Sequence, residues 1–232
     1  FMIEMLEQRR LLAAVTNGVL TLGTDIADVY VISVEGQDLV VMENGQRQVF
    51  ALSEVSFINA DLRDGDDYFN MGGVPIPAFI FGGAGNDTII GGSSRDTIYG
   101  GSGDDEIRGG PGNDSIQGGA GNDTIRAGLG NDVVAGGSGN DEIYGGEGHD
   151  LLRGNEGDDT IRGLAGNDSI YGGKGNDLLS GGSGDDILDG LAGIDTVNGQ
   201  LGMDICIGEV VNDPDNFVQG SSYLASINPV LA

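Results

Sequence analysis

Residues 118–126 read GGAGNDTIR, and variants of this nine-letter string follow one another without a gap from residue 82 to residue 207. These 126 residues divide into 14 units, here called nonads, whose positions are numbered as places one to nine. Place six is Asp in every nonad, place four is Gly in all but one, and place eight is Ile, Leu or Val in all but the last. Such regularity predicts an architecture in which each unit packs mainly on its neighbours.

The residue types split each nonad into a turn and a strand. Places one to six follow the pattern Gly-Gly-x-Gly-Asn/Asp-Asp, and these residue types tolerate the positive φ angles of tight turns. Places seven to nine, such as residues 88–90, centre an aliphatic residue in a short segment with strand propensity. Because side chains alternate along a strand, place eight should face one side, and places seven and nine the other.

A turn after every strand would reverse the chain each time, so nonad n should stack on nonad n+2. The predicted fold class is therefore all-β, a right-handed parallel β-roll (a solenoid) with two nonads, or 18 residues, in each coil. The place-eight residues should fill its interior: Ile89, Ile98, Ile107, Ile116, Ile125, Val134, Ile143, Leu152, Ile161, Ile170, Leu179, Leu188, Val197 and Cys206.

The composition favours cations as partners. The chain has 232 residues, with 37 Asp and Glu against 10 Lys and Arg, and its net charge of −27 argues against binding nucleic acid or an anionic membrane. A single Cys excludes an intrachain disulfide framework, and a single His excludes most zinc sites and His-based triads. No run of 18 apolar residues is present, so we expect no membrane span. We also expect a monomer.

The Asp residues at place six point to a metal. Stacking would align them in two columns, with successive carboxylates facing each other across neighbouring turns whose glycine carbonyls are free. Because one aliphatic residue per nonad makes a thin interior, a bound cation should be part of the fold. An all-oxygen site suits Ca²⁺, and six gaps in each of two columns allow at most 12 ions. The predicted metal ligands are Asp87, Asp96, Asp105, Asp114, Asp123, Asp132, Asp141, Asp150, Asp159, Asp168, Asp177, Asp186, Asp195 and Asp204.

The nonad pattern resembles the RTX (haemolysin-type) calcium-binding nonapeptide repeat. The resemblance covers residues 82–207 and implies a β-roll that binds Ca²⁺ between turns n and n+2 through the place-six Asp and turn carbonyls. It further implies a secreted bacterial protein, commonly exported by a type I system, that folds in extracellular calcium. Ser94 and Arg95 in the second nonad, and Ile194 and Met203 near the end, depart from the pattern, so we expect impaired sites there.

The N-terminal segment carries a second resemblance. Residues 6–12, LEQRRLL, are similar to the LEPR-x-LL-type motif of planctomycete extracellular proteins, with Gln8 where that motif has Pro. This resemblance implies that residues 1–16 are a targeting-like segment of a secreted protein. A short amphipathic helix or a frayed end is the alternative interpretation.

The flanks of the repeat are interpreted as caps. Residues 17–81 are predicted to form a β-meander, with a hairpin at Asn44-Gly45 and two degenerate nonads at residues 23–31 and 62–70. Residues 82–207 are the predicted calcium-binding roll. Residues 208–232 are predicted to be a C-terminal cap, with an export tail as the alternative.

The expected function is calcium binding by a secreted structural module of a cell surface or extracellular matrix. No H-E-x-x-H or G-x-S-x-G motif is present, so we expect that the chain is not an enzyme. The alternative function is binding of polysaccharide, or adhesion, by an outer face. The place-nine column Arg108, Arg126, Tyr144 and Arg162 is a candidate for that face, or else a ladder of charge pairs with Glu106 and Glu142.

Overall fold

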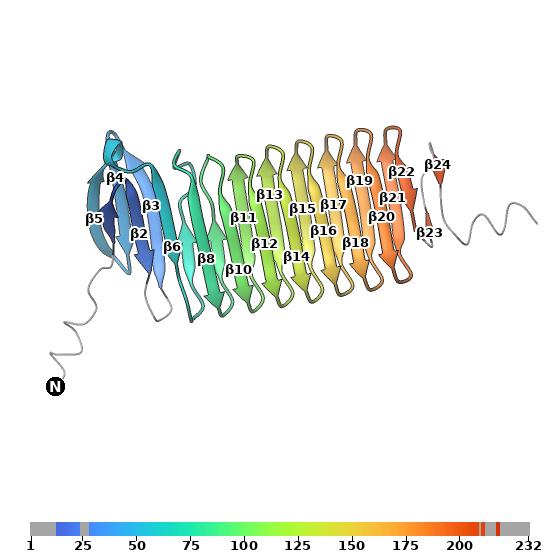
Figure 1. The fold of residues 1–232 in the computed structure, drawn as a ribbon, viewed down its shortest axis with the longest axis horizontal. Coiled ribbons are helices and arrows are strands. Elements are labelled where there is room, and N and C mark those ends of the chain that lie inside the picture. The colour runs from blue at the N-terminus through green and yellow to red at the C-terminus, as the bar shows by residue number, and fades with distance from the viewer. Residues whose placement is uncertain (1–12, 24–27, 209, 212–216, 219–232) are drawn as a thin grey trace, which may run out of the picture.

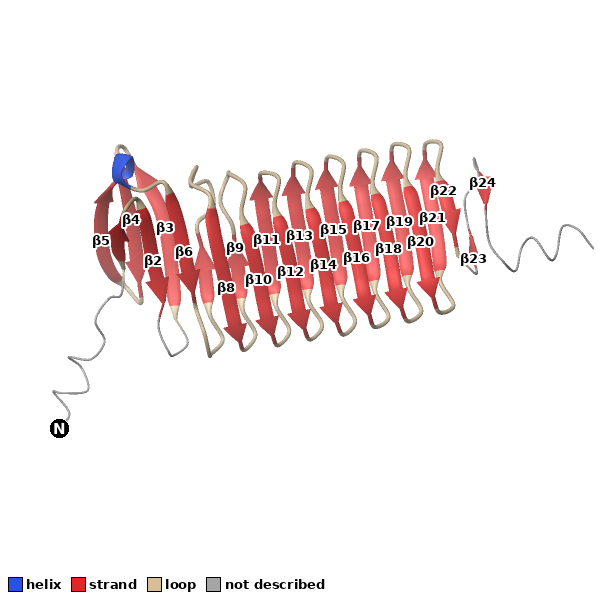
Figure 2. Ribbon diagram, in the orientation of Figure 1, coloured by secondary structure: helices blue, strands red, loops and turns tan. Residues whose placement is uncertain are grey.

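A computed structural model describes residues 13–23, 28–208, 210–211 and 217–218. Two 12-stranded sheets face each other along a long, flattened solenoid (Figure 1). One short 3₁₀ helix, η1 (Leu52–Glu54), interrupts the strands near the N-terminal end (Figure 2). Within the described ranges, no helix is long and apolar enough to cross a membrane.

The strands alternate between the two sheets along most of the chain. The first sheet contains, in spatial order, β1 (Ala14–Thr16), β2 (Val19–Gly23), β6 (Phe57–Asp61), β8 (Ala78–Ala84), β10 (Thr97–Ser102), β12 (Ser115–Ala120), β14 (Val133–Ser138), β16 (Leu151–Glu156), β18 (Ser169–Lys174), β20 (Ile187–Ala192), β22 (Ile205–Ile207) and β24 (Phe217–Val218). The second sheet contains β5 (Gln46–Ala51), β4 (Asp38–Glu43), β3 (Val29–Glu35), β7 (Tyr68–Asn70), β9 (Thr88–Ile90), β11 (Glu106–Pro111), β13 (Thr124–Leu129), β15 (Glu142–Glu147), β17 (Thr160–Ala165), β19 (Leu178–Ser183), β21 (Thr196–Leu201) and β23 (Val210–Val211).

The predicted stacking of nonad n on nonad n+2 is confirmed. Parallel strands pair at a separation of 18 residues, as in Ile98 with Ile116 and Ile107 with Ile125. All 14 place-eight residues are buried between the sheets, and none is more than 2% exposed. The interior of the roll is therefore the single aliphatic row per sheet that the repeat predicts.

The strands are longer, and the turns shorter, than the sequence predicts. A typical strand such as β12 has six residues, which are places seven to nine of one nonad and places one to three of the next. The glycine at place two stays in the ladder at a positive φ, as Gly119 does at 129° opposite Gly101. Glycine alone populates this mirror-image extended region readily, so the strand continues where propensity predicts a turn.

Close approach of neighbouring coils gives a second reason for glycine at these places. A Cβ atom added at Gly103 would lie inside the van der Waals envelope of the backbone of Gly85, and one at Gly110 inside that of Gly92. The coils therefore pack backbone against backbone, which keeps the ladder regular and brings the turns close together.

The N-terminal region is only partly the predicted meander. Strands β3, β4 and β5 pair antiparallel, and so do β1 and β2. Asn44 and Gly45 have φ angles of 47° and 80°, which confirms the predicted hairpin. However, β2 and β6 in one sheet and β3 and β7 in the other already pair in parallel, so the solenoid begins before residue 82.

The two sheets extend past the end of the repeat. Strands β23 and β24 continue the two sheets beyond the last nonad, to residue 218. The targeting-like motif of residues 6–12 lies outside the described residues, as does most of the predicted C-terminal cap or export tail.

Candidate metal-binding turns

The two predicted Asp columns are present at the turns of the roll. Every place-six Asp from Asp87 to Asp204 is at most 2% exposed. The carboxylate Oδ1 of each accepts a hydrogen bond from a backbone N–H of the preceding coil, at 2.7–2.9 Å. Asp141, for example, accepts from the N–H of Asp123 and donates its own N–H to Asp159. Each column is thus a continuous ladder of hydrogen bonds that joins the turns along one edge of the roll.

The second carboxylate oxygen of most of these residues is buried without a hydrogen-bond partner. A buried carboxylate oxygen with no donor is costly, which makes these atoms the natural place for a cation. The residues whose Oδ2 atom is in this state include Asp87, Asp105, Asp114, Asp123, Asp132, Asp141, Asp150, Asp159, Asp168, Asp177 and Asp186.

Backbone carbonyls converge on the same places as these oxygens. A Cβ atom built at Gly118, which is place one of its nonad, would touch Asp123 Oδ2 and would lie 2.7 Å from the carbonyl oxygen of Gly136. The same arrangement surrounds Gly163, with Asp168 Oδ2 and the carbonyl of Gly181. The missing side chain leaves a cradle lined by oxygen from two successive coils.

Side chains alone do not complete a metal site here. Among the described residues, no group of three or more His, Cys, Asp or Glu side chains is close enough to hold a metal ion. Ligands would therefore come from carboxylates and backbone carbonyls together. A hard, flexible, all-oxygen donor set of this kind fits Ca²⁺ better than Zn²⁺ or a softer metal.

Burial gives the columns unusual acid–base properties. It raises the pKa of five Asp carboxyls to about 7: Asp105, Asp114, Asp141, Asp150 and Asp186. At Asp141 the hydrogen bond from Asp123 lowers the pKa in part, whereas the charges of Asp123 and Asp159 raise it. The columns therefore resist ionisation unless positive charge enters between the coils.

The comparison with known families agrees with this geometry. A family model of the RTX calcium-binding nonapeptide repeat matches residues 79–107, 108–143, 144–179, 153–188 and 180–213, which together cover more than half of the chain. The chain belongs to this family. It is a calcium-binding RTX β-roll with acidic Asp columns. RTX repeats are typical of secreted bacterial proteins. No curated protein matches the chain.

A second ladder runs beside each Asp column of the RTX roll, and the sequence argument missed it. The place-five side chain of one nonad accepts a hydrogen bond from the place-five N–H two nonads later, as Asn122 Oδ1 does from Asn140. His149 fits this pattern, because its Nδ1 atom accepts from the N–H of Asn167. The preference for Asn and Asp at place five was the available signal, and it reflects this acceptor role.

One column also extends beyond the RTX match toward the N-terminus. Asp67 is 3% exposed and its N–H donates to Asp87 Oδ1 at 2.8 Å, as in the regular nonads. Asp28 is 2% exposed, and its N–H donates to Asp67 Oδ1. The Oδ2 atoms of both lack a hydrogen-bond partner. The predicted ligand set omitted these two residues, although their degenerate nonads were visible in the sequence.

The second RTX nonad differs from the others in the way its Asp is held. Gly92 donates its N–H to Asp96 Oδ2 at 2.7 Å, so both oxygens of this carboxylate accept from the backbone. The turn around Ser94 is also irregular, because β9 ends at Ile90 instead of continuing into the next nonad. At the other end, Ile194 and Met203 have no acceptor at place five, so the second ladder stops there.

Proposed function

We propose that this chain is a secreted structural module that folds when Ca²⁺ binds between its turns and that serves at a cell surface or in an extracellular matrix. The observation that carries the proposal is the stack of buried carboxylate oxygens without hydrogen-bond partners, most of them beside a backbone carbonyl of the next coil. Calcium would supply the positive charge that these oxygens lack.

The two oxygens of each place-six carboxylate would have different roles. The Oδ2 atoms of the place-six Asp residues and the turn carbonyls would hold the ion, and Oδ1 would keep neighbouring coils in register through its hydrogen bond. Because the unfolded chain has no such cradle, the free energy of ion binding becomes free energy of folding. A net charge of −27 further opposes a compact metal-free state.

The test is far-ultraviolet circular dichroism with size-exclusion chromatography, at several Ca²⁺ concentrations and in EGTA. We expect chelation to abolish the β-signal and expand the chain, with a cooperative calcium midpoint at roughly 10⁻⁴–10⁻³ M, the range of extracellular modules. Equimolar Mg²⁺ is the control and should not restore the fold, because it requires stricter octahedral geometry. A β-signal that survives EGTA at pH 7.5 would refute the proposal.

A binding rather than a catalytic role is part of this proposal. The alternative, recognition of polysaccharide by an outer face, gains no support from the predicted place-nine column of the second sheet. Arg108 and Arg126 lie 2.7 Å and 3.7 Å from Glu106, and Arg162 lies 3.2 Å from Glu142. That column is a ladder of internal charge pairs whose cations are already neutralised.

A further inference from the structure

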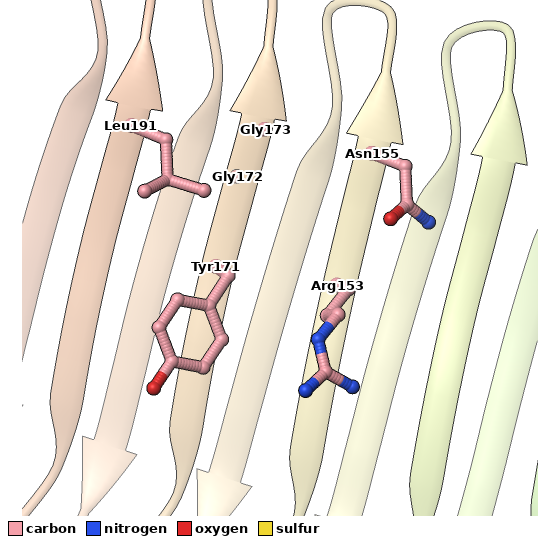
Figure 3. A pocket seen from close by; sticks show the side chains of 6 residues that line it. All are labelled: Arg153, Asn155, Tyr171, Gly172, Gly173 and Leu191. Carbon is pink, nitrogen blue, oxygen red and sulfur yellow. The ribbon is translucent and has the colours of Figure 1, made fainter.

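The first sheet carries a hollow on its outer face, and none of the side chains that line it is a predicted calcium ligand, although Gly172 also borders the cradle of Asp177 Oδ2. It has a volume of 190 Å³ and is lined by residues of three neighbouring strands, β16, β18 and β20. Its lining consists of Arg153, Asn155, Tyr171, Gly172, Gly173 and Leu191. In Figure 3, Asn155 and Leu191 stand on either side of Gly173, and Tyr171 and Arg153 lie side by side at one end.

The hollow arises from departures in the repeat. Asn155 and Leu191 occupy place two, where a regular nonad has glycine, and they adopt φ angles of 84° and 69°. Backbone in this region is unfavourable for residues with a Cβ atom, more so for Leu than for Asn, and such strain often marks a functional position. Gly173 pairs with both residues across the sheet and has no side chain, so it forms the floor between two walls.

The end of the hollow presents a cation without an internal counter-ion. No carboxylate of the described residues lies within ion-pair distance of Arg153, in contrast with the paired arginines of the second sheet. The guanidinium carbon of Arg153 instead lies 5.8 Å from the centroid of the Tyr171 ring. This cation–π contact restrains the guanidinium while its forked donors remain available to a ligand.

The lining groups together define the chemistry of a ligand. A guanidinium pairs best with a planar carboxylate through two parallel hydrogen bonds. An amide at Asn155 can donate to and accept from hydroxyl groups. The ring face of Tyr171 suits a sugar ring that presents C–H groups, because the negative face of an aromatic ring attracts weakly positive hydrogens. The side chain of Leu191 adds an apolar contact on the other wall.

We propose that this hollow binds an acidic sugar unit, a uronate, of an extracellular polysaccharide, with Arg153 on the carboxylate and Tyr171 against the sugar ring. The volume is below the roughly 300–1,000 Å³ of pockets for larger ligands, so it takes one sugar ring, and the rest of the chain would run over the sheet. The proposal rests on the proposed calcium dependence, because bound Ca²⁺ offsets the net charge of −27 that would otherwise repel an anion.

The experiment uses the calcium-loaded full chain, isotopically labelled, titrated with methyl glucuronide or with methyl glucoside. These two probes differ only by a carboxylate in place of a hydroxymethyl group. We expect saturable shifts of the backbone amides of Gly172 and Gly173 and of the Arg153 side chain with the uronate. The neutral probe should bind at least about tenfold more weakly, because it lacks the charged hydrogen bonds.

Two variants separate this site from a general effect. Arg153→Gln should weaken binding of the uronate by about tenfold or more. The matched control, Arg126→Gln, alters an ion-paired arginine of the opposite sheet and should leave binding unchanged. Each variant is first checked for the calcium-dependent β-signal, so that failure to fold is distinguished from failure to bind. Equal binding by Arg153→Gln and wild type, equal binding of the two probes, or shifts confined to other surfaces would overturn the proposal.

Discussion

Replacing Asp141 by Asn tests whether the columns act as calcium ligands across neighbouring coils. Asp141 lies in the middle of its column, between Asp123 and Asp159, and therefore borders two gaps. Asn preserves the Oδ1 acceptor for the N–H of Asp123 but removes the charge and the carboxylate Oδ2. The matched variant is Asp204→Asn, which borders one gap, with Asp186, in the described part of its column.

The structure sets the expected size of the effect. A site held at a calcium concentration about 100 times its dissociation constant contributes about 2.7 kcal/mol to folding. Loss of two such sites in Asp141→Asn would cost about 5 kcal/mol, and loss of one in Asp204→Asn would cost about half of that. If about ten ions bind to the wild type as the roll folds, and about eight and about nine bind to the two variants, these losses raise the calcium midpoint by about threefold and about 1.7-fold.

The assay is a calcium titration of both variants and the wild type, followed by circular dichroism at pH 7.5. In EGTA, Asp141→Asn should be no less folded than the wild type, because it removes a buried carboxyl whose pKa is already raised to about 7. Equal midpoint shifts for the two variants, or a larger shift for Asp204→Asn, would refute the stacking of successive Asp residues around shared ions.

Three further predictions follow from the same contacts. Because burial raises the folded-state pKa of several column Asp residues to about 7, the metal-free roll loses stability as pH rises from about 4 to about 7, and protons compete with calcium below about pH 7. Circular dichroism in EGTA should therefore detect more β-structure at pH 5 than at pH 7.5, and the calcium midpoint should rise on acidification. A calcium midpoint that does not change with pH would contradict the raised pKa values. Asp67→Asn should raise the calcium midpoint about as much as Asp141→Asn, although Asp67 lies outside the family match, and an unchanged midpoint in a titration would limit the column to the regular nonads. Leu164 has a φ of 85°, so Leu164→Gly should stabilise the calcium-loaded roll by about 1 kcal/mol in urea denaturation. The control Gly146→Ala should destabilise the roll, because its new methyl group would overlap the backbone of Gly128. If Leu164→Gly is less stable than the wild type, the contacts of the Leu164 side chain outweigh the backbone strain.

The sequence by itself determined the repeat, the stacking and the two columns. A period of nine with Asp at place six and an aliphatic residue at place eight leaves few alternatives, because each short strand must bury one side chain against its neighbours. Ile125 and Asp123 lie where their places in the nonad predict, one between the sheets and the other at a turn. Because the period is strict, a residue placement that is right for one nonad is right for the other regular nonads as well.

Only the tertiary structure decided how long the strands are, where the roll begins and what the second carboxylate oxygen meets. Propensity assigns Gly119 to a turn, yet the ladder of neighbouring coils holds it in a strand at φ 129°. The degenerate nonad of Asp67 is visible in the sequence, but only the structure shows that the N–H and the carboxylate of Asp67 continue the ladder of Asp87. The hollow at Gly173 depends on side chains 18 residues away on either side, which no local pattern brings together. In each case the deciding contact joins successive coils, and such contacts exist only once the coils have stacked.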